Sequence, residues 1–327
     1  MNAEGPETLI EAVQHFADPQ VCHRYMVKLK WPDGKITCPK CGSDKIGQIA
    51  TRCMLRCNAV VDGKRCGKQF SVKVGTIFED SPLPLHKWFI AVWCVINAKN
   101  GVSSYEIHRA LGVTQKTAWF MDHRIRLAME TGTFRKLHDV VESDETFIGG
   151  KAKNMHKAKR EKVIQGRGSV GKTPVHGLLE RGDDDNPSQV KATVIPNTEQ
   201  VTLMSELMRH VERNTVVCTD ESDSYANIAD RYIHQFVNHS IEYVRGKVHT
   251  NGLENFWSLL KRCIRGTYVH VAPFHLQRYL DEEVARFNWR KMNDGQRFNM
   301  VMQGVLGKRI TYRLLCAIED AGFMGIK

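Results

Sequence analysis

Five of the ten cysteines in this chain lie in one short stretch, between residues 38 and 66, and the others are scattered singly. Such crowding argues for a metal site rather than a disulfide framework. Cys38 and Cys41 are followed by Gly42, so both thiolates can reach one ion while the glycine permits a tight turn. A segment this short cannot bury enough apolar surface to fold unaided. The stretch therefore predicts a small β module held by zinc.

A second pair of cysteines must complete the tetrahedral zinc site. We choose Cys57 and Cys66, because Cys66-Gly67 repeats the Cys-Gly step and the intervening NAVVDGKR can form an extended loop. Cys53 is the alternative to Cys57, although its alternation with Leu55 and Cys57 also fits a residue that faces the small core. Four sulfur ligands leave no open position for substrate, so the single zinc ion should be structural. The predicted zinc ligands are Cys38, Cys41, Cys57 and Cys66.

A helix-turn-helix pattern follows within residues 83–131. Ser103 or Ser104 caps a first helix, Gly112 begins the turn, and Thr114 caps a second helix, QKTAWFMDHRIRLAM. The second helix should expose polar and basic groups that suit base edges and phosphates in a major groove. The predicted DNA-binding residues on it are Gln115, Lys116, His123, Arg124 and Arg126. A plain helical hairpin with a solvated basic face is the alternative.

The pattern changes to alternating strands and helices from Val140 onward. Strands are expected at 139–150, 174–180, 189–195, 215–220 and 234–238, and helices at 199–213, from about 222, and at 253–262. Three strands, helix, strand, helix, strand, helix is the order of a ribonuclease-H-like domain with a mixed sheet. The fold class is therefore multidomain, α+β and α/β. The predicted domains are a helical lead-in at 1–34, a zinc ribbon at 35–76, the helix-turn-helix at 83–131, the catalytic domain at 138–292 and a helical tail at 293–327.

Three carboxylates fall where a ribonuclease-H-like sheet would bring them together. Asp144 lies in the first strand of that domain, Asp220 ends the fourth, and Glu254 opens the last helix. Clustered like charges are unfavourable without cations, and carboxylate oxygens suit magnesium or manganese. Two such ions would activate a water or a 3′ hydroxyl and stabilise the departing oxygen. The triad therefore predicts metal-dependent phosphoryl transfer at Asp144, Asp220 and Glu254.

Each acid of the triad also has a simpler interpretation. Glu142 shares a strand face with Asp144, so one of the two could be merely solvated. Asp220 could cap a following helix, and Glu254 could complete a capping box with Asn251. The element order favours catalysis over these separate roles.

Basic and aromatic residues follow Glu254 on the same helix. Lys261 lies two turns after Glu254, so both side chains project from one face, where Lys261 could steady the scissile phosphate. Arg262 and Arg265 extend the positive edge, and we count Arg262 among the DNA-binding residues. Trp257 could stack on an extrahelical base or, as the more common alternative, belong to the core. The basic stretch 151–172 is expected to become ordered on DNA phosphates.

The overall charge agrees with a nucleic-acid partner. The chain has 47 Lys and Arg against 36 Asp and Glu, a net charge of +11, and such an excess favours a polyanion through counterion release. The first residues lack the pattern of a secretory signal, and no window approaches a membrane span. We therefore expect a cytoplasmic, nucleoid-associated protein that has no membrane contact.

Several strings of the sequence resemble, in order, those of one family. They are CPKCGS, QFSVKVGTIFEDSPLPLHKWFIAVW, TAWFMDHRIRLAM, ESDETFIGGK, VHGLLER, TDESDSY and HTNGLENFWSLLKRCIRGTYVHVAPFHLQRYLDEEVARFNWR. Over residues 20–292 the chain resembles the zinc-ribbon DDE transposases of the insertion-sequence fifteen-ninety-five group, which are related to Merlin elements. The resemblance implies that Asp144, Asp220 and Glu254 are metal ligands and that Lys261 is the basic residue that follows. Because the third acid can be Asn or His in this family, Asn251 and His249 stay as reserve candidates. The long gap between Cys57 and Cys66 departs from the short second knuckle of the family.

These features together predict a DNA transposase. It would bind the end repeats of its element as double-stranded DNA, nick there and join 3′ hydroxyls to target DNA, acting as a homodimer or higher oligomer. A domesticated or decayed transposase that acts as a non-enzymatic DNA-binding regulator is the alternative, and a nuclease without strand transfer is a further one.

Overall fold

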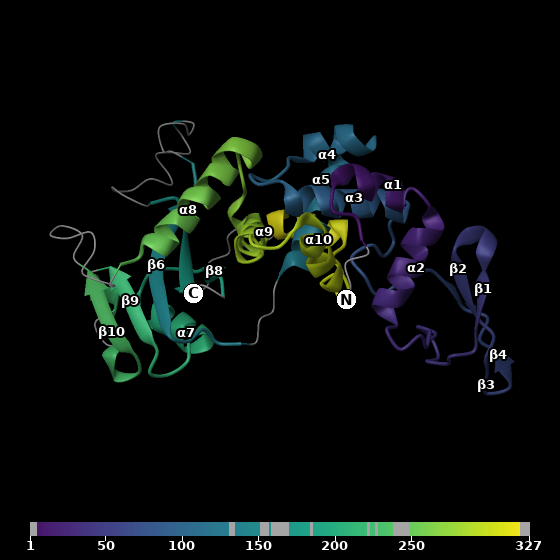
Figure 1. Cartoon of the computed structure of the whole chain (residues 1–327), viewed down its shortest axis with the longest axis horizontal. Helices are drawn as coiled ribbons and strands as arrows, with labels where there is room; N and C mark the ends of the chain where they lie inside the picture. The colour runs from purple at the N-terminus through teal and green to yellow at the C-terminus, as the bar shows by residue number, and fades with distance from the viewer. Residues whose placement is uncertain are drawn as a thin grey trace. The chain divides into compact units, whose positions relative to one another are not determined.

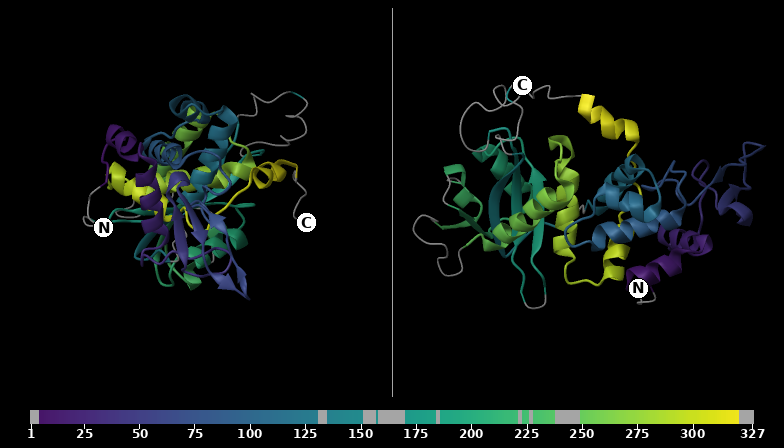
Figure 2. Two further views of the ribbon diagram at one scale, coloured as in Figure 1. Left: turned by 90° about the vertical axis from the view of Figure 1, so that its right-hand side faces the viewer. Right: turned by 90° about the horizontal axis from the view of Figure 1, so that it is seen from above.

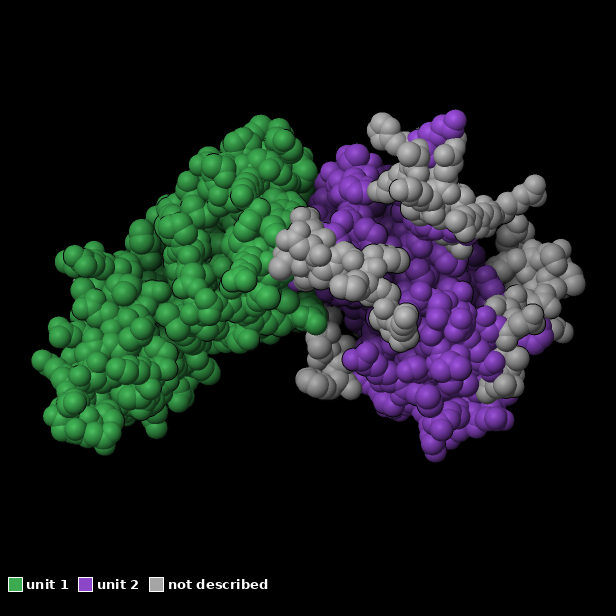
Figure 3. All heavy atoms as spheres, turned by 180° about the vertical axis from the view of Figure 1, so that it is seen from behind, with its two compact units in different colours: residues 1–130, 292–327 green, residues 131–291 purple. Residues whose placement is uncertain are grey.

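The computed structural model describes residues 5–130, 135–150, 157, 170–183, 186–220, 223–225, 228–237 and 249–320. The chain divides into two compact units, coloured separately in Figure 3. Unit 1 comprises residues 1–130 and 292–327, and unit 2 comprises residues 131–291. Most of the basic stretch 151–172 lies outside the described residues. Within the described part, no helix has both the length and the apolar character needed to cross a membrane.

Unit 1 opens with two helices, α1 (Leu9–Phe16) and α2 (Pro19–Lys30), shown in purple in Figure 1. The break between them has a local cause. The Asp18 side chain accepts the N–H of Gln20 at 2.8 Å, and Pro19 takes the first helical position, where its missing N–H costs nothing.

The cysteine-rich module consists of five short strands. They are β1 (Ile46–Ile49), β2 (Met54–Cys57), β3 (Val60–Val61), β4 (Lys64–Arg65) and β5 (Gln69–Phe70). β1, β2 and β5 form an antiparallel sheet, and β3 pairs with β4 as a hairpin. Asp62 and Gly63 at its tip have φ of 51° and 75°, the positive values that a tight hairpin turn requires. This hairpin accounts for the long gap between Cys57 and Cys66.

The remainder of unit 1 is helical. Its helices are α3 (Leu85–Asn97), α4 (Ser104–Leu111), α5 (Gln115–Met129), α10 (Asp294–Gln303) and α11 (Tyr312–Asp320). The rings of Phe16, Phe89 and Phe298 lie with centroids 4.9 to 5.9 Å apart, so α1, α3 and α10 share one aromatic core. The C-terminal segment, which the sequence suggested only as a tail, therefore packs against the first helices of the chain.

The pair α4 and α5 has the local signals that the sequence predicted. Ser103 caps α4 in a capping box with Glu106, and Gly112 ends that helix at φ 58°. Thr114 caps α5 by accepting the N–H of Thr117 at 3.1 Å. Two helices joined by a three-residue turn result.

Unit 2 is built on one five-stranded mixed sheet. Its strands are β6 (Val140–Ile148), β7 (Thr173–Glu180), β8 (Gln189–Val194), β9 (Val216–Asp220) and β10 (Ile233–Val237). Their order across the sheet is β10-β9-β6-β7-β8. β7 runs antiparallel to β6 and β8, whereas β6, β9 and β10 are parallel. All five strands match the predicted strands closely.

Helices cover the two faces of this sheet with separate apolar cores. α7 (Gln200–His210) contributes Leu203 and Leu207 to one core. α8 (Asn251–Cys263) and α9 (Leu276–Asn288) supply the other, and α8 lies across β6 and β7 (Figures 1 and 2). The described part of the predicted short helix near residue 222 consists of two 3-10 turns, Asp223–Tyr225 and Ile228–Asp230.

Gly177 on β7 is where α8 approaches the sheet most tightly. A β-carbon there would lie 2.4 and 2.6 Å from two ring atoms of Trp257 and 3.0 Å from a methyl of Leu253. We expect Gly177→Ala to destabilise unit 2 by about 1 to 3 kcal/mol through overpacking, measured by denaturant unfolding. Gly150→Ala is the control, since its β-carbon would meet nothing within 4 Å. Equal stability of the two variants would contradict this account of the packing.

Candidate active site and zinc site

Four thiols converge in the β module of unit 1. The sulfur atoms of Cys38, Cys41, Cys57 and Cys66 all lie within 4.8 Å of one another. Two pairs are 3.9 Å (Cys38 and Cys66) and 3.5 Å (Cys41 and Cys57) apart. A tetrahedral zinc ion with Zn–S bonds of about 2.3 Å needs sulfur separations of roughly 3.8 Å. The donor set therefore fits a structural zinc ion.

Cys53 does not belong to this cluster. Its sulfur accepts a hydrogen bond from the side-chain amide of Gln20 on α2 at 3.3 Å, and its backbone takes a positive φ of 47°. The structure thus favours Cys57 over Cys53 as the ligand, in agreement with the choice made from the sequence.

The predicted exposed basic face of α5 is wrong for three residues. His123, Arg124 and Arg126 are buried, with at most 4% of each exposed. The Arg124 guanidinium donates to the backbone carbonyls of Ile77 and Glu79 at 2.7 and 2.8 Å, which stabilises its buried charge. These three side chains are therefore not accessible to the bases or phosphates of DNA. Gln115 is half-buried and Lys116 is exposed at the first turn of α5.

In unit 2, strand register brings the first two acids of the triad side by side. β6 and β9 pair in parallel, with Val140 opposite Val216 and Glu142 opposite Cys218. Continuing that register places Asp220, the last residue of β9, opposite Asp144. Residues in register on neighbouring parallel strands project from the same face of a sheet. The carboxyl groups of Asp144 and Asp220 therefore point to the face that α8 covers.

Helix α8 adds the third acid and a line of polar groups. A cavity of about 530 Å³ is lined by Asp144, Glu145, Thr146, Glu254, Trp257, Ser258, Lys261, Arg262 and Arg265. Asp220 does not line it. α8 begins after Thr250 with no side-chain cap, so the capping-box interpretation of Glu254 is wrong. Glu254 is exposed and is available to a ligand.

Trp257 links α8 to the first acid. Its indole Nε1–H donates to Oδ2 of Asp144 at 2.8 Å, while the backbone N–H of Glu145 donates to Oδ1 at 2.8 Å. With 4% of its surface exposed, Trp257 belongs to the core, so stacking on an extrahelical base is excluded. Its second role, which the sequence did not reveal, is to fix the orientation of the Asp144 carboxylate.

Replacing Trp257 with Phe tests that role. The change keeps a buried ring but removes the donor, so the Asp144 pKa should rise and divalent cations should bind more weakly. We expect the magnesium concentration for half-maximal binding, measured by titration calorimetry, to increase roughly tenfold, the effect of one charge-assisted hydrogen bond. Trp289→Phe is the control, because Trp289 is buried but does not line the cavity. An unchanged magnesium affinity in Trp257→Phe would remove this role.

Burial and like charge act together on the carboxyl groups. Burial, followed by the negative charges of Asp220 and Glu254, raises the pKa of Asp144 to about 6 against the bond from Trp257. Burial likewise raises the pKa of Glu145 to about 7, although the hydroxyl of Tyr225 donates to its carboxylate. The site therefore holds carboxyl groups whose ionised forms are disfavoured until a cation balances them.

The three carboxylates of the predicted triad do not form a compact ligand cluster of the kind that the cysteines form. Among the described residues, only the four cysteines bring three or more ligand atoms within 4.8 Å of each other. The oxygens of Asp144, Asp220 and Glu254 are more widely spread. Their oxygen chemistry suits magnesium or manganese.

Glu142 has a structural role that the sequence did not reveal. Its buried carboxylate accepts the Nε–H of Arg181 at 2.8 Å and the backbone N–H of Leu253, in the first turn of α8, at 3.0 Å. Arg181 also donates to the carbonyl of His249 at 2.7 Å. A β-carbon on Gly252 would lie 2.8 Å from this carboxylate. Glu142 therefore stabilises the first turn of α8, and His249 takes part in the same hydrogen-bond network.

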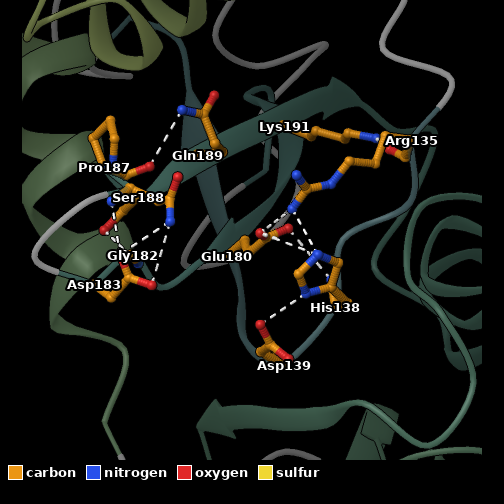
Figure 4. A network of polar contacts seen from close by, with 11 residues as sticks. Arg135, His138, Asp139, Glu180, Gly182, Asp183, Pro187, Ser188, Gln189 and Lys191 are labelled. Atoms are coloured by element: carbon orange, nitrogen blue, oxygen red, sulfur yellow. Dashed lines mark hydrogen bonds and ion pairs between the residues drawn. The ribbon is translucent and has the colours of Figure 1, made fainter.

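A second polar pocket lies at the opposite end of β6. Arg135 contacts the carboxylate of Glu180 there, and Nδ1 of His138 lies 2.8 Å from Oδ2 of Asp139 (Figure 4). Lys191 donates to the carbonyl of Arg135 at 2.6 Å. Arg135 and Lys191 thus have partners within this pocket.

Comparisons with known proteins agree with this picture. The ISXO2-like transposase domain matches residues 136–288, and the transposase zinc-ribbon domain matches residues 18–69. The chain is 24% identical over 261 residues to an uncharacterized protein in transposable element ISH50 of Halobacterium salinarum, covering 77% of this chain and 85% of that protein. It is 30% identical over 101 residues to an uncharacterized transposase-like protein of Haemophilus influenzae, covering 31% of this chain and 81% of that protein.

These similarities define the class of protein as a transposase. The chain belongs to the ISXO2-like family, the insertion-sequence fifteen-ninety-five group, which confirms the resemblance seen in the sequence.

Proposed function

We propose that the chain nicks DNA at the ends of its element and joins the freed 3′ hydroxyls to target DNA. One observation carries the proposal. Asp144 and Glu254, from elements far apart in the sequence, line one cavity with Lys261, and the charge of Asp220 acts on Asp144 from the neighbouring strand. A cluster of carboxylates next to an amine suits a phosphodiester bound through divalent cations.

The topology of unit 2 supports a ribonuclease-H-like catalytic domain. Three antiparallel strands in sequence, β6 to β8, are followed by two strands that add in parallel beside β6. That order places the C-terminal end of β9, which carries Asp220, beside the middle of β6, which carries Asp144. The third acid comes from the helix that crosses the same face.

Each residue then has a defined task. Magnesium or manganese, when bound, would activate the attacking oxygen and stabilise the leaving one. Asp144, Asp220 and Glu254 would supply the ligands, and Trp257 keeps Asp144 oriented through its indole N–H. Lys261 would bind a non-bridging oxygen of the scissile phosphate. The chain itself would form no covalent intermediate with DNA.

DNA recognition is assigned to unit 1. The first turn of α5 presents Gln115 and Lys116 after the three-residue turn, which suits a helix that enters a major groove with its N-terminal end. Because two element ends must be paired, we propose that the active form on DNA is a homodimer or larger. We propose that the protein is cytoplasmic and associated with the nucleoid, where both the element ends and the target DNA are present.

A nicking and joining assay tests the proposal. Purified chain is incubated with magnesium, a duplex carrying the terminal sequence of its element, and a target duplex, and nicked and joined strands are measured. We expect both products, and a loss on the order of 1,000-fold or more in Asp220→Ala. Asp230→Ala is the control, since Asp230 is exposed on a 3-10 turn. Absence of both products, or full activity in Asp220→Ala, would refute the function.

A further inference from the structure

The cavity beside α8 separates its charges. Asp144, Glu145 and Glu254 form an acidic side, and Lys261, Arg262 and Arg265 form a basic side. No carboxylate among the described residues lies within ion-pair distance of those three cations, whereas Arg135 in the second pocket contacts Glu180 (Figure 4). Burial and repulsion by Arg265 and Lys172 lower the pKa of Lys261, although the negative charge of Asp144 opposes this shift. Unpaired cations kept close together indicate a polyanionic ligand.

The polar groups of α8 are spaced along one line. Glu254, Ser258, Lys261 and Arg265 occur at intervals of four, three and four residues, which keeps them on one helical face. At a rise of 1.5 Å per residue, the line from Glu254 to Arg265 extends over roughly 16 Å. It is long enough to follow a DNA strand beyond the phosphate at the carboxylates.

The backbone around Arg265 departs from regular α-helical geometry, and this departure determines the position of the residue. Residues Ile264–Tyr268 form a π-helical turn, and Val269 follows at φ 61° and ψ −53°. His270 N–H donates to the carbonyl of Tyr268 at 2.6 Å, which closes a γ-turn around Val269. Positive φ is strained for a β-branched residue, and both π-turns and such strain cluster at functional sites.

The π-helical turn is anchored on its other side by α9. The Tyr268 hydroxyl donates to Oε1 of Glu282 at 2.5 Å, and its ring packs edge-on against Tyr279 with centroids 4.7 Å apart. Glu282 is fully buried. The turn that carries Arg265 is thus held in place by contacts with α9. Arg265 itself is exposed and lines the cavity.

We propose that Arg265, with Arg262, forms a second phosphate subsite, which binds the DNA strand next to the phosphate held by the carboxylates and Lys261. That the bound strand is the one being cut rests on the proposed function. The ligand is a backbone phosphate, recognised by the guanidinium through two parallel hydrogen bonds without regard to base sequence.

Salt-dependent binding tests this subsite without requiring catalysis. The full chain is titrated with the terminal-sequence duplex at several salt concentrations, with calcium in place of magnesium. We expect Arg265→Gln to weaken binding roughly tenfold, as loss of a charge-assisted contact does. The slope of log affinity against log salt should become shallower by about 0.9 for a duplex phosphate, or about 0.7 for a single strand. Arg265→Lys should retain the slope but lose part of the affinity.

A control variant and a chemical probe locate the contact. Arg231→Gln removes an exposed arginine of the same unit that does not line the cavity, and should leave affinity and slope unchanged. A neutral methylphosphonate linkage beside the cut site should weaken the wild type but have no added effect in Arg265→Gln. An unchanged slope in Arg265→Gln, an equal change in Arg231→Gln, or additive effects of probe and variant would each overturn the subsite. If Arg265 proves essential for binding yet wild type cuts no DNA, the subsite stands and the proposed chemistry fails.

Discussion

Asp144→Asn should abolish DNA cutting and at the same time make unit 2 more stable at neutral pH. The variant keeps the shape of the side chain and one oxygen, enough for the Trp257 N–H but not also for the Glu145 N–H, and it loses the charged metal ligand. Nicking should therefore fall on the order of 1,000-fold or more. The gain in stability follows from the raised pKa of Asp144, because a buried carboxylate that prefers to be protonated opposes folding when it is ionised.

The sign of the pH dependence can be worked out for metal-free protein. The Asp144 pKa is about 6 in the folded state, whereas the ordinary pKa of an aspartate, which applies to the unfolded chain, is 3.8. Between these values the folded state binds more protons than the unfolded state, so the stability contributed by this group falls as pH rises. The cost is fully present above about pH 6, where it amounts to roughly 2 to 3 kcal/mol, and it vanishes below about pH 4.

Denaturant unfolding in a chelator measures this cost. Asp144→Asn should exceed the wild type in free energy of unfolding near neutral pH and equal it at about pH 4. Asp230→Asn changes an exposed aspartate of the same unit. Its free energy of unfolding should equal that of the wild type at both pH values. A less stable Asp144→Asn at neutral pH would contradict the electrostatic account of the site. Magnesium should stabilise the wild type more than the variant, because only the wild type keeps the full ligand set.

Cys57→Ser should remove zinc from the chain and unfold the β module of unit 1. The strands from β1 to β5 are two to four residues long, too short to hold together without the four-thiolate site. Metal analysis should find one zinc ion in the wild type and nearly none in the variant. Limited proteolysis should then cleave within residues 46–70.

Cys53→Ser is the matched control for this prediction. Cys53 is only four positions away and contacts Gln20 rather than the cluster. The control variant should retain zinc and protease resistance. Loss of zinc in Cys53→Ser with retention in Cys57→Ser would reverse the assignment of the ligands.

The sequence alone was enough for features set by local chemistry. The strands of unit 2 and its helices α7 and α8 followed from hydrophobic periodicity, and the caps at Ser103 and Thr114 followed from side chains that satisfy nearby N–H groups. The closely spaced pair Cys38 and Cys41 and the repeated Cys-Gly step at Cys66 indicated three of the four thiols that the structure brings together. These signals act within a few residues, so they can be recognised without the fold.

Features that depend on distant partners could not be found in this way. Arg124 appeared suited to DNA, but its acceptors are carbonyls 45 and 47 positions earlier in the chain. Glu142 appeared to be a possible spare carboxylate, but it holds the first turn of α8, 111 positions later. The packing of Phe298 on Phe16 was equally hidden. In each case the pattern shows that a residue is polar or apolar, and only the fold supplies its partner.

Iron-directed cleavage of the backbone tests most directly whether three carboxylates hold divalent cations together. Fe²⁺ is added in place of magnesium with ascorbate and peroxide, and the hydroxyl radicals cut the chain next to the bound ion. We predict cuts near residues 144, 220 and 254 in one protein, suppressed by excess magnesium and lost in Asp220→Ala. Cuts at only one of these places, or an unchanged pattern in Asp220→Ala, would contradict a shared metal site.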